Sequence, residues 1–441
     1  MDTKLLFEKA LEAGITEIEV YRSKKSASEV GIFNHQVETL NSNSLNVCYI
    51  RGAYNGHLGS VYVENNNLSV DEIIATIKDN AGLINIDEPY FIYPGDDSYP
   101  ELKPYEGDFA EHSMTEKTEL ILALAKKVEE LSEFVTCPEA SYEESFFEYS
   151  IENSNGLNVS KKGGYAYLVA EVVAKKGDEI KSGYEVQLVK KFSEFDVDKM
   201  AKDAVDGVVS KFGGEPIVSG GYKTVVKSSV VRSLLGAFSN VFTAEMLIRK
   251  MSFLGGKEGT QVFGSNITIY DDPLCELAPS QDSFDDEGVA AKTKTVVENG
   301  VFKTFLHNLK TAKMLGTTTT GNGYKAGVSA GVGVKPSNFY LAPGDKSFDD
   351  LLAECGNGFY LTDVQGLHAG INIINGDFSL QAQGFEVVDG KLGKPVTLVV
   401  ASGNITALLN DVLAIGNDLT FKSGNIGAPS ILVGNLSISG K

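Results

Sequence analysis

The stretch Asn-Ser-Asn-Ser-Leu-Asn-Val at residues 41–47 returns almost unchanged as Asn-Ser-Asn-Gly-Leu-Asn-Val at residues 153–159. Six of the seven positions are identical, which indicates an internal duplication of the first half of the chain. An amphipathic helical pattern precedes each copy, and another follows it, beginning near Val70 and Val197. The sequence therefore predicts two tandem helix-strand-strand-strand-helix units. Their sheets should be antiparallel, because the regular strand-helix alternation of a parallel sheet is missing.

Local signals agree with this duplication. Gly14 stands where the C-terminal cap of the first helix is expected, and Ser113 with Glu116 forms a capping-box pattern before the first helix of the second unit. A two-residue alternation of apolar and polar side chains predicts strands. It is found at residues 17–21, 36–40 and 146–151.

Breaks in composition suggest the domain organisation. A duplicated α+β domain is expected over residues 1–212, with repeats at about 1–85 and 113–212. The Gly-rich segment 213–221 is typical of a linker. A second, β-rich domain is expected over residues 222–441.

The second half combines one clear helical pattern with many short strand-like segments. Apolar residues recur at helical spacing from about Ser228 to Arg249. Asn299-Gly300 and Asp389-Gly390 are typical of hairpin tips. We expect an α+β protein in which the duplicated antiparallel domain is followed by a mostly β, barrel-like or sandwich-like domain.

Composition and charge exclude several classes of protein. The 441 residues include 39 Lys and Arg against 59 Asp and Glu, a formal net charge of −20. Direct nucleic-acid binding is disfavoured, since phosphates repel such a surface. No run reaches the ~18 apolar residues of a membrane helix, and no export signal is recognised. The four cysteines at positions 48, 137, 275 and 355 are widely separated. These features predict a cytoplasmic protein with no membrane partner.

Well-known catalytic motifs are missing from the sequence. The chain contains no HExxH or HExxxH, no GxSxG with a plausible triad and no phosphate-binding GxxxxGK[ST] loop. A zinc hydrolase that needs no partner is therefore disfavoured. The Gly-rich residues 327–333 are better interpreted as a strand connection or bulge.

Two acidic groups occur in the second half. Asp271-Asp272-Pro273 follows a predicted strand and favours a turn. Asp285, Asp286 and Glu287 could together hold a hard cation. Adjacent residues on a strand face opposite ways, however, so we expect an exposed loop.

Two histidines are candidate site residues. His307 belongs to an alternating segment and is expected to be a strand histidine. His368 lies between Gly366 and Gly370, which would allow close approach of a substrate backbone. A substrate-binding set is predicted from Gly366, His368, Gly370, Asp377 and Ser379. If the chain were a hydrolase in its own right, His368, Asp377 and His307 would be its catalytic candidates.

The chain from Leu234 to Gly440 resembles the TldD/PmbA family of metallopeptidases, also described as putative modulators of DNA gyrase, and the duplicated first domain fits that family too. The motifs that carry this resemblance are residues 249–254, 271–273, 284–289, 366–370, 375–379, 416–419 and 427–430. The resemblance implies a peptidase that processes unfolded or small peptides and takes part in peptide maturation.

In this family two related subunits are thought to pair, and only the TldD-type subunit carries an HExxxH helix and a late-loop Cys that bind zinc. Here Gly236, Ala237 and Val241 stand where His, Glu and His would belong, and residues 420–425 contain no Cys. The chain therefore resembles the PmbA/TldE-type subunit. The resemblance implies no metal in this chain, zinc on a partner subunit, and a substrate-binding role here.

The sequence leaves more than one partner and more than one activity possible. The resemblance implies a dimer with a TldD-type paralogue or with a second copy of this chain. Two other functions are considered: a hydrolase active without a partner, and an acidic regulator of a DNA-processing enzyme.

Overall fold

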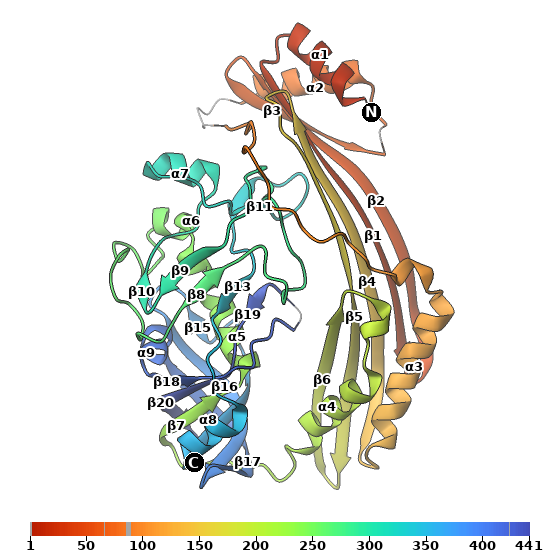
Figure 1. Ribbon diagram of the computed structural model, residues 1–441. Coiled ribbons are helices and arrows are strands. Elements are labelled where there is room, and N and C mark those ends of the chain that lie inside the picture. Colours follow the sequence, from red (N-terminus) through yellow and green to blue (C-terminus); the bar gives the residue numbers. More distant parts are fainter. Residues whose placement is uncertain (1, 66, 85–89, 423) are drawn as a thin grey trace.

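The computed structural model describes residues 2–65, 67–84, 90–422 and 424–441. Two β-rich halves lie side by side (Figure 1), a long curved sheet from the first part of the chain and a more compact body from the second. Met1, Asn66, residues 85–89 and Ser423 lie outside the described residues, so the predictions that include them are tested only in part.

The long sheet is antiparallel throughout and joins the two repeats. Its strands, in spatial order, are β3 (His57–Glu64), β2 (Gln36–Tyr54), β1 (Glu17–Phe33), β4 (Val135–Asn153), β5 (Asn158–Lys176) and β6 (Glu179–Val189). The first strands of the two repeats, β1 and β4, pair with each other along the centre of the sheet. The predicted duplicated antiparallel architecture is confirmed.

Each repeat begins and ends with a helix. The helices are α1 (Thr3–Glu12), α2 (Val70–Gly82), α3 (Met114–Glu130) and α4 (Val197–Val209). Ser113 and Glu116 form the predicted capping box at the start of α3. Gly14 follows α1 with φ +88°, as its predicted capping role requires.

Apolar faces of these helices hold the sheet. In the second repeat, α3 and α4 pack on β5, where alternate small and aliphatic residues from Ala166 to Ala174 are fully buried. Leu124 of α3 and Val205 of α4 belong to this core. Each such side chain contributes about 1.5–3 kcal/mol by leaving water.

The repeated heptapeptide does not occupy equivalent places in the two units. Residues 41–47 lie inside β2, whereas residues 153–159 form the turn between β4 and β5. The second strands of the units begin at Gln36 and Asn158, an offset of 158 − 36 = 122, while the heptapeptides are offset by 153 − 41 = 112. The duplication was predicted correctly, but the repeated heptapeptide does not mark equivalent positions in the two repeats.

The second half contains a five-stranded barrel. Its strands, in order, are β14 (Gly358–Gln365), β7 (Gly220–Val226), β20 (Ile431–Ser439), β17 (Lys391–Asn404) and β16 (Asp377–Val388). Pairing of β14 with β16 closes the barrel. The short strands β15 (Ile371–Asn372) and β18 (Val412–Ile415) extend it. The expectation of a mostly β, barrel-like second domain is confirmed.

A smaller sheet lies above the barrel (Figure 1). It contains β10 (Val301–Phe302), β9 (Lys294–Glu298), β8 (Ile269–Asp271), β13 (Phe339–Leu341) and β19 (Ile426–Gly427). A separate hairpin pairs β11 (Gly323–Lys325) with β12 (Val332–Val334), and the Gly-rich segment connects them as predicted. Asn299-Gly300 and Asp389-Gly390 are hairpin tips in which all four residues have positive φ.

The helix predicted from Ser228 to Arg249 is broken. It consists of α5 (Ser228–Phe238), a 3₁₀ turn and α6 (Ala244–Ile248). Thr243, between them, is extended and forms a bridge with Leu306, and its side chain caps α6. This long-range pairing outweighs the local helical pattern. The remaining helices are α7 (Leu309–Leu315), α8 (Phe348–Cys355) and α9 (Ile405–Asn410).

Candidate functional site

The acidic segment 285–287 lies at the contact between the two halves. Asp285 is 1% exposed, and its carboxylate accepts backbone N–H groups from Glu287, Val289 and Gly323 at 2.8–3.0 Å. Burial, reinforced by the charge of Glu287, raises the pKa of Asp285. The prediction of an exposed loop was wrong, because docking against the first half buries the segment and backbone donors satisfy its carboxylates.

The neighbouring acids point in different directions, as expected for adjacent residues. Asp286 accepts a 2.9 Å hydrogen bond from the Tyr21 hydroxyl of β1 and a 2.8 Å bond from the Lys325 backbone. Glu287 accepts from the backbone N–H of Leu309 at 2.8 Å. Burial raises the pKa of Glu287 to about 7. The carboxylates of Asp286 and Glu287 thus accept hydrogen bonds from backbone N–H groups and from the Tyr21 hydroxyl.

A half-buried lysine, whose amine nitrogen is enclosed, completes this contact. The Lys325 amine lies 4.0 Å from the ring centroid of Tyr21 and 4.8 Å from that of Tyr49. Among the described residues this amine has no hydrogen-bond partner, and burial lowers its pKa to about 8. Arg51 is paired with Glu19 at 2.7 Å on the same sheet. We refer to Glu19, Tyr21, Arg51, Asp286, Glu287 and Lys325 as the interdomain cluster.

Sequence reasoning missed most of the interdomain cluster. One signal was available: β1 is rich in apolar residues near its start, yet it places Glu19, Tyr21 and Ser23 on one face. All three are nearly fully buried. A polar face on a strand with such neighbours indicates a buried polar contact with another part of the chain.

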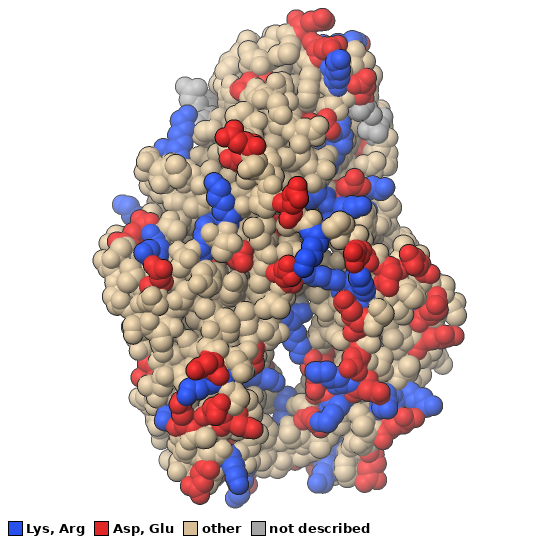
Figure 2. All heavy atoms as spheres, viewed as in Figure 1, with Lys and Arg blue, Asp and Glu red and all other residues tan. Residues whose placement is uncertain are grey.

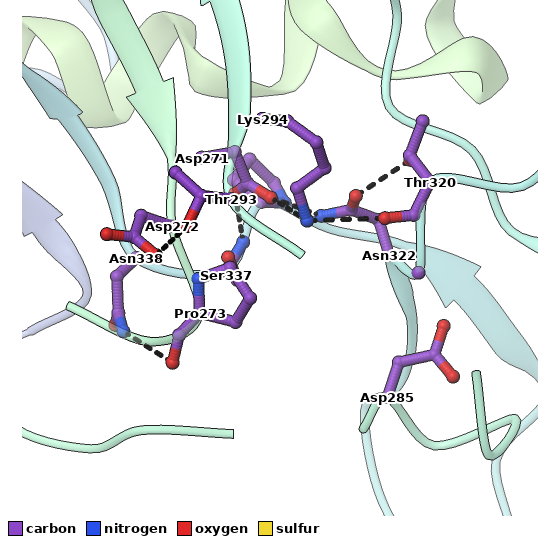
Figure 3. Close-up of polar contacts among 12 residues, drawn as sticks. Asp271, Asp272, Pro273, Asp285, Thr293, Lys294, Thr320, Asn322, Ser337 and Asn338 are labelled. Atoms are coloured by element: carbon purple, nitrogen blue, oxygen red, sulfur yellow. Dashed lines mark hydrogen bonds and ion pairs between the residues drawn. The ribbon is translucent and has the colours of Figure 1, made fainter. Parts of the chain in front are cut away.

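A second buried polar network surrounds Asp271 (Figure 3). Its carboxylate accepts from Ser337 N at 2.5 Å and Asn322 Nδ2 at 2.8 Å, and pairs with Lys294 Nζ at 2.7 Å. Asp272 instead accepts from Leu274 N and Thr293 Oγ1. Asp272 therefore lies in the predicted turn. Asp271, in contrast, is fully buried and forms an ion pair with Lys294.

Helix α5 packs against Phe421 and Ile426, the part of the chain where the family resemblance would place zinc ligands in a TldD-type subunit. A Cβ placed on Gly236 of α5 would lie 3.5 Å from Ile426 of β19, directly after the late loop, and Arg232 Nη1 donates to Phe421 O at 2.7 Å. Val241 is fully buried. Glycine, valine and isoleucine side chains offer no lone pair to a metal, so these residues do not fit a zinc ion. The described residues contain no group of three or more His, Cys, Asp or Glu that could hold one.

The candidate residues of the hydrolase alternative lie on separate segments of the second half. Asp377 begins β16 and is held by Asn375 and Asn404. His368 is exposed in the turn after β14. His307 is buried before α7, where burial lowers its pKa. The described hydrogen bonds and ion pairs do not link His307 to His368 or Asp377. His307 follows a bend rather than continuing the predicted strand, since β10 ends at Phe302.

The predicted substrate-binding glycines lie at one end of the barrel. Gly366 has φ +85° and shapes the turn that holds His368. Gly370 approaches the neighbouring strand closely, because a Cβ there would lie 2.2 Å from the Ser379 carbonyl oxygen. Ser379 N donates to Gly370 O at 2.7 Å. The lack of a side chain at Gly370 thus allows the protein's own backbone at Ser379 to come close, rather than the backbone of a substrate as predicted.

The fold and these sites define a class: a duplicated helix-and-sheet domain joined through a polar contact to a five-stranded barrel. The chain belongs to the PmbA/TldD metallopeptidase family. The family model of the PmbA/TldA metallopeptidase C-terminal domain matches residues 219–440, and that of the central domain matches residues 107–212. In the described residues, no helix has the length and apolar character needed to span a bilayer.

Curated relatives carry protease names. A metalloprotease PmbA homologue of Haemophilus influenzae is 29% identical over 289 residues, which make up 65% of this chain and 61% of that protein. A metalloprotease of Archaeoglobus fulgidus is 35% identical over 240 residues, 54% of this chain and 55% of that protein. The chain thus spans less than two thirds of the length of these relatives.

Solved structures match over nearly the whole chain. A putative modulator of a DNA gyrase from Thermotoga maritima has a TM-score of 0.92 and 29% identity, with 99% of each chain covered. TldE from Thermococcus kodakarensis has a TM-score of 0.89 and 24% identity, covering 99% of this chain and all of that one, 100%. The second similarity concerns the fold alone.

Proposed function

We propose that this chain is the PmbA/TldE-type subunit of a two-component metallopeptidase. It holds unfolded or small peptides while a zinc-bearing TldD-type subunit hydrolyses them. Zinc on that partner supplies the metal-activated water. This chain contributes binding surface and takes part in proteolysis and peptide maturation without a metal of its own. We place the complex in the cytoplasm, which agrees with the four free cysteines.

One contact carries this proposal: the apolar packing of α5 on β19, directly after the late loop. A Cβ added to Gly236 would lie at van der Waals distance from Ile426, where the family resemblance would place imidazole and thiolate ligands in a TldD-type chain. A metal there would find neither a donor atom nor space. The fold around this contact is retained, so this chain differs from the TldD type in the metal-ligand side chains and not in the backbone that would carry them.

A free sheet edge supports the proposed partnership. Strand β3 pairs with β2 only from Val47 onward, so within the described residues the edge of segment 36–46 has no strand beside it. This segment is exposed on both faces, including Leu40 at 61%. It lacks the lysines and prolines that usually protect an edge strand. We propose that the second subunit covers this edge (Figure 1).

Native mass spectrometry of the tagged chain, recovered gently from its own cells, tests both points. We expect a heavier complex that contains a zinc-bearing paralogue, and no stoichiometric zinc on this chain alone. Leu40→Lys should abolish the complex by placing a charge on the edge, whereas Leu392→Lys, an exposed residue of the barrel, should leave it intact.

The other functions predict different results, in this experiment or in a peptidase assay of the chain alone. Zinc bound to a homodimer of this chain would contradict the proposal. Peptidase activity of the chain alone that resists a chelator and is lost in His368→Ala would favour the independent hydrolase. Recovery of a DNA-processing enzyme in place of a paralogue would favour the regulator.

A further inference from the structure

A cavity of about 350 Å³ lies between strand β6 of the long sheet and the barrel. It is lined by Glu179 and Lys181 of β6, by the linker at Gly214 and by strands β14, β16 and β17. In Figure 1, β6 is the strand of the long sheet nearest the barrel, and Figure 2 shows the hollow between the two halves. None of the residues discussed above as catalytic candidates lines this cavity.

Strand β6 presents a free edge at this cavity. Within the described residues β6 pairs only with β5, so the backbone N–H and C=O groups on its other side have no strand beside them. The stretch from Glu179 to Tyr184 contains no proline. Its one lysine, Lys181, pairs with Glu179 at 2.9 Å, which neutralises the charge that would otherwise protect the edge. The start of β6 is therefore open to pairing with another strand.

Apolar side chains are exposed beside this edge. Ile180 and Tyr184 lie on the same face of β6, with Ser182 between them, and their exposed fractions are 61% and 73%. The side chains of an added strand would lie ~4.5–5.5 Å from those directly opposite on β6. Ile180 and Tyr184 therefore offer contacts to alternate side chains of such a strand.

The facing wall of the cavity carries uncharged amides. Gln365 of β14 and Gln381 of β16 are directly paired in the barrel, and both are exposed. Neither amide has a hydrogen-bond partner within the described part of the chain. The remaining charge in the lining, Asp363, accepts a hydrogen bond from Gln383 at 2.7 Å. A primary amide has a donor and an acceptor, as a peptide unit does, so this wall can bind a backbone of any sequence.

The dimensions of the cavity decide which occupant fits. The β6 edge faces the barrel of its own chain, so a folded subunit placed on it would meet the barrel wall. One added strand needs only ~4.7–4.9 Å from its neighbour. A volume of about 350 Å³ is typical of sites for small ligands. The cavity thus suits a single extended segment, in contrast to the edge at residues 36–46, which is exposed on both faces.

We propose that an extended peptide binds as an additional strand on the edge of β6 at residues 179–184, with Gln365 and Gln381 bonded to its other edge. The inference rests on the proposed peptide-binding function and adds where on this chain the peptide lies. Main-chain hydrogen bonds give the affinity in this mode of binding, so selectivity for sequence is low. Further along β6, Glu185 pairs with Lys422 of the late loop, so the binding stretch ends beside that loop.

Fluorescence anisotropy on the full chain tests the inference. The probe is a fluorescein-labelled Thr-Val-Thr-Val-Thr amide, and its matched control carries N-methyl groups on both valines. N-methylation removes two backbone donors and leaves the side chains unchanged. We expect the N-methylated peptide to bind at least about tenfold more weakly, the combined effect of two neutral hydrogen bonds. Equal affinities for the two peptides would overturn the inference.

Variants on the two walls test where the peptide lies. Ile180→Lys places a charge beside the edge and should weaken binding about tenfold or more. Leu11→Lys, on a 51% exposed side chain of α1, adds the same charge away from the cavity and should leave binding unchanged. Gln381→Leu removes one amide and should weaken binding about threefold to tenfold. Full affinity in either Ile180→Lys or Gln381→Leu would contradict the proposed site.

Hydrogen exchange followed by mass spectrometry locates the peptide without any mutation. Backbone N–H groups on a free edge exchange rapidly, so the peptide should slow exchange in residues 179–189 and leave α1 unchanged. Protection confined to other segments would refute the inference. Assembly with a zinc-bearing subunit is read separately by native mass spectrometry, so failure here leaves the proposed function to its own test. Loss of that assembly in Ile180→Lys, with no peptide bound by the wild type, would instead place the second subunit on this edge and overturn the inference.

Discussion

The hydroxyl of Tyr21 donates a 2.9 Å hydrogen bond to Asp286, a residue 265 positions later in the chain. This bond connects β1 of the long sheet with the acidic segment of the second half. The Lys325 amine lies over the same tyrosine ring at 4.0 Å. One aromatic side chain therefore contacts both an anion and a cation of the other half, and its two contacts can be separated by mutation.

Tyr21→Phe removes the hydroxyl but keeps the ring under Lys325. The half-buried Asp286 carboxylate then loses a hydrogen-bond donor, and we expect the free energy of unfolding to fall by about 1–3 kcal/mol. Urea unfolding followed by circular dichroism measures this change. Tyr62→Phe, at a 43% exposed tyrosine, is the control. An equal midpoint for both variants would show that the Tyr21 bond adds no stability.

Glu287 should make the protein less stable as the pH rises toward neutrality. Its pKa is about 7 in the folded chain against 4.5 for an ordinary glutamate, mainly because it is buried. Between these values the unfolded chain releases the proton and the folded chain keeps it, so rising pH favours unfolding. Relative to Glu287→Gln, the wild type should lose on the order of 1–3 kcal/mol across this window. Urea midpoints at several pH values test this, and parallel curves for the two proteins would refute it.

Lys325 should have the opposite effect at alkaline pH. Burial lowers its pKa to about 8 from 10.5, so between these values the folded chain has released a proton that the unfolded chain still binds. Stability should therefore rise with pH across this window. Lys325→Met, which keeps the length of the side chain without its charge, should abolish the rise. The same urea series, extended to higher pH, measures the difference.

Lys294→Met should be costly because it leaves the fully buried Asp271 without its counter-charge. Breaking a buried pair from one side costs about 3–5 kcal/mol. Lys303→Met breaks the pair with Glu298, where both side chains are about half exposed, and should cost less than about 1 kcal/mol. Similar urea midpoints for the two variants would mean that the amides around Asp271 are sufficient to hold its charge.

Two glycines with nearly the same backbone conformation should respond differently to alanine. Gly56 has φ +83° and open space around it, so Gly56→Ala carries only the backbone strain, about 1–2 kcal/mol. Gly300 has φ +80°, and a Cβ there would lie 2.2 Å from the Phe263 carbonyl oxygen. Gly300→Ala should therefore cost several kcal/mol more than strain alone. Thermal unfolding of the two variants compares them directly, and equal losses would show that the β9–β10 hairpin moves to accept the methyl group.

Several features of the fold could be predicted because short-range patterns encode them. The capping box at Ser113, the hairpin tip at Asn299-Gly300 and the alternation along the strands each depend on neighbouring residues alone. The family resemblance also followed from motifs read in sequence, and the family models match the same half of the chain.

Other features needed the tertiary structure, since they depend on residues far apart in the chain. A bridge from Thr243 to Leu306 divides a pattern that locally favours one helix. The acids 285–287 appear exposed in sequence and become buried only because β1 and the β11–β12 hairpin lie against them.

The sequence by itself thus determined the duplicated antiparallel class and the barrel-like second domain. Only the tertiary structure decided which polar residues meet: Lys325 over Tyr21 and Lys294 on Asp271. The physical reason is that periodicity and turn chemistry act over a few residues, whereas burial of a charge depends on every segment packed around it.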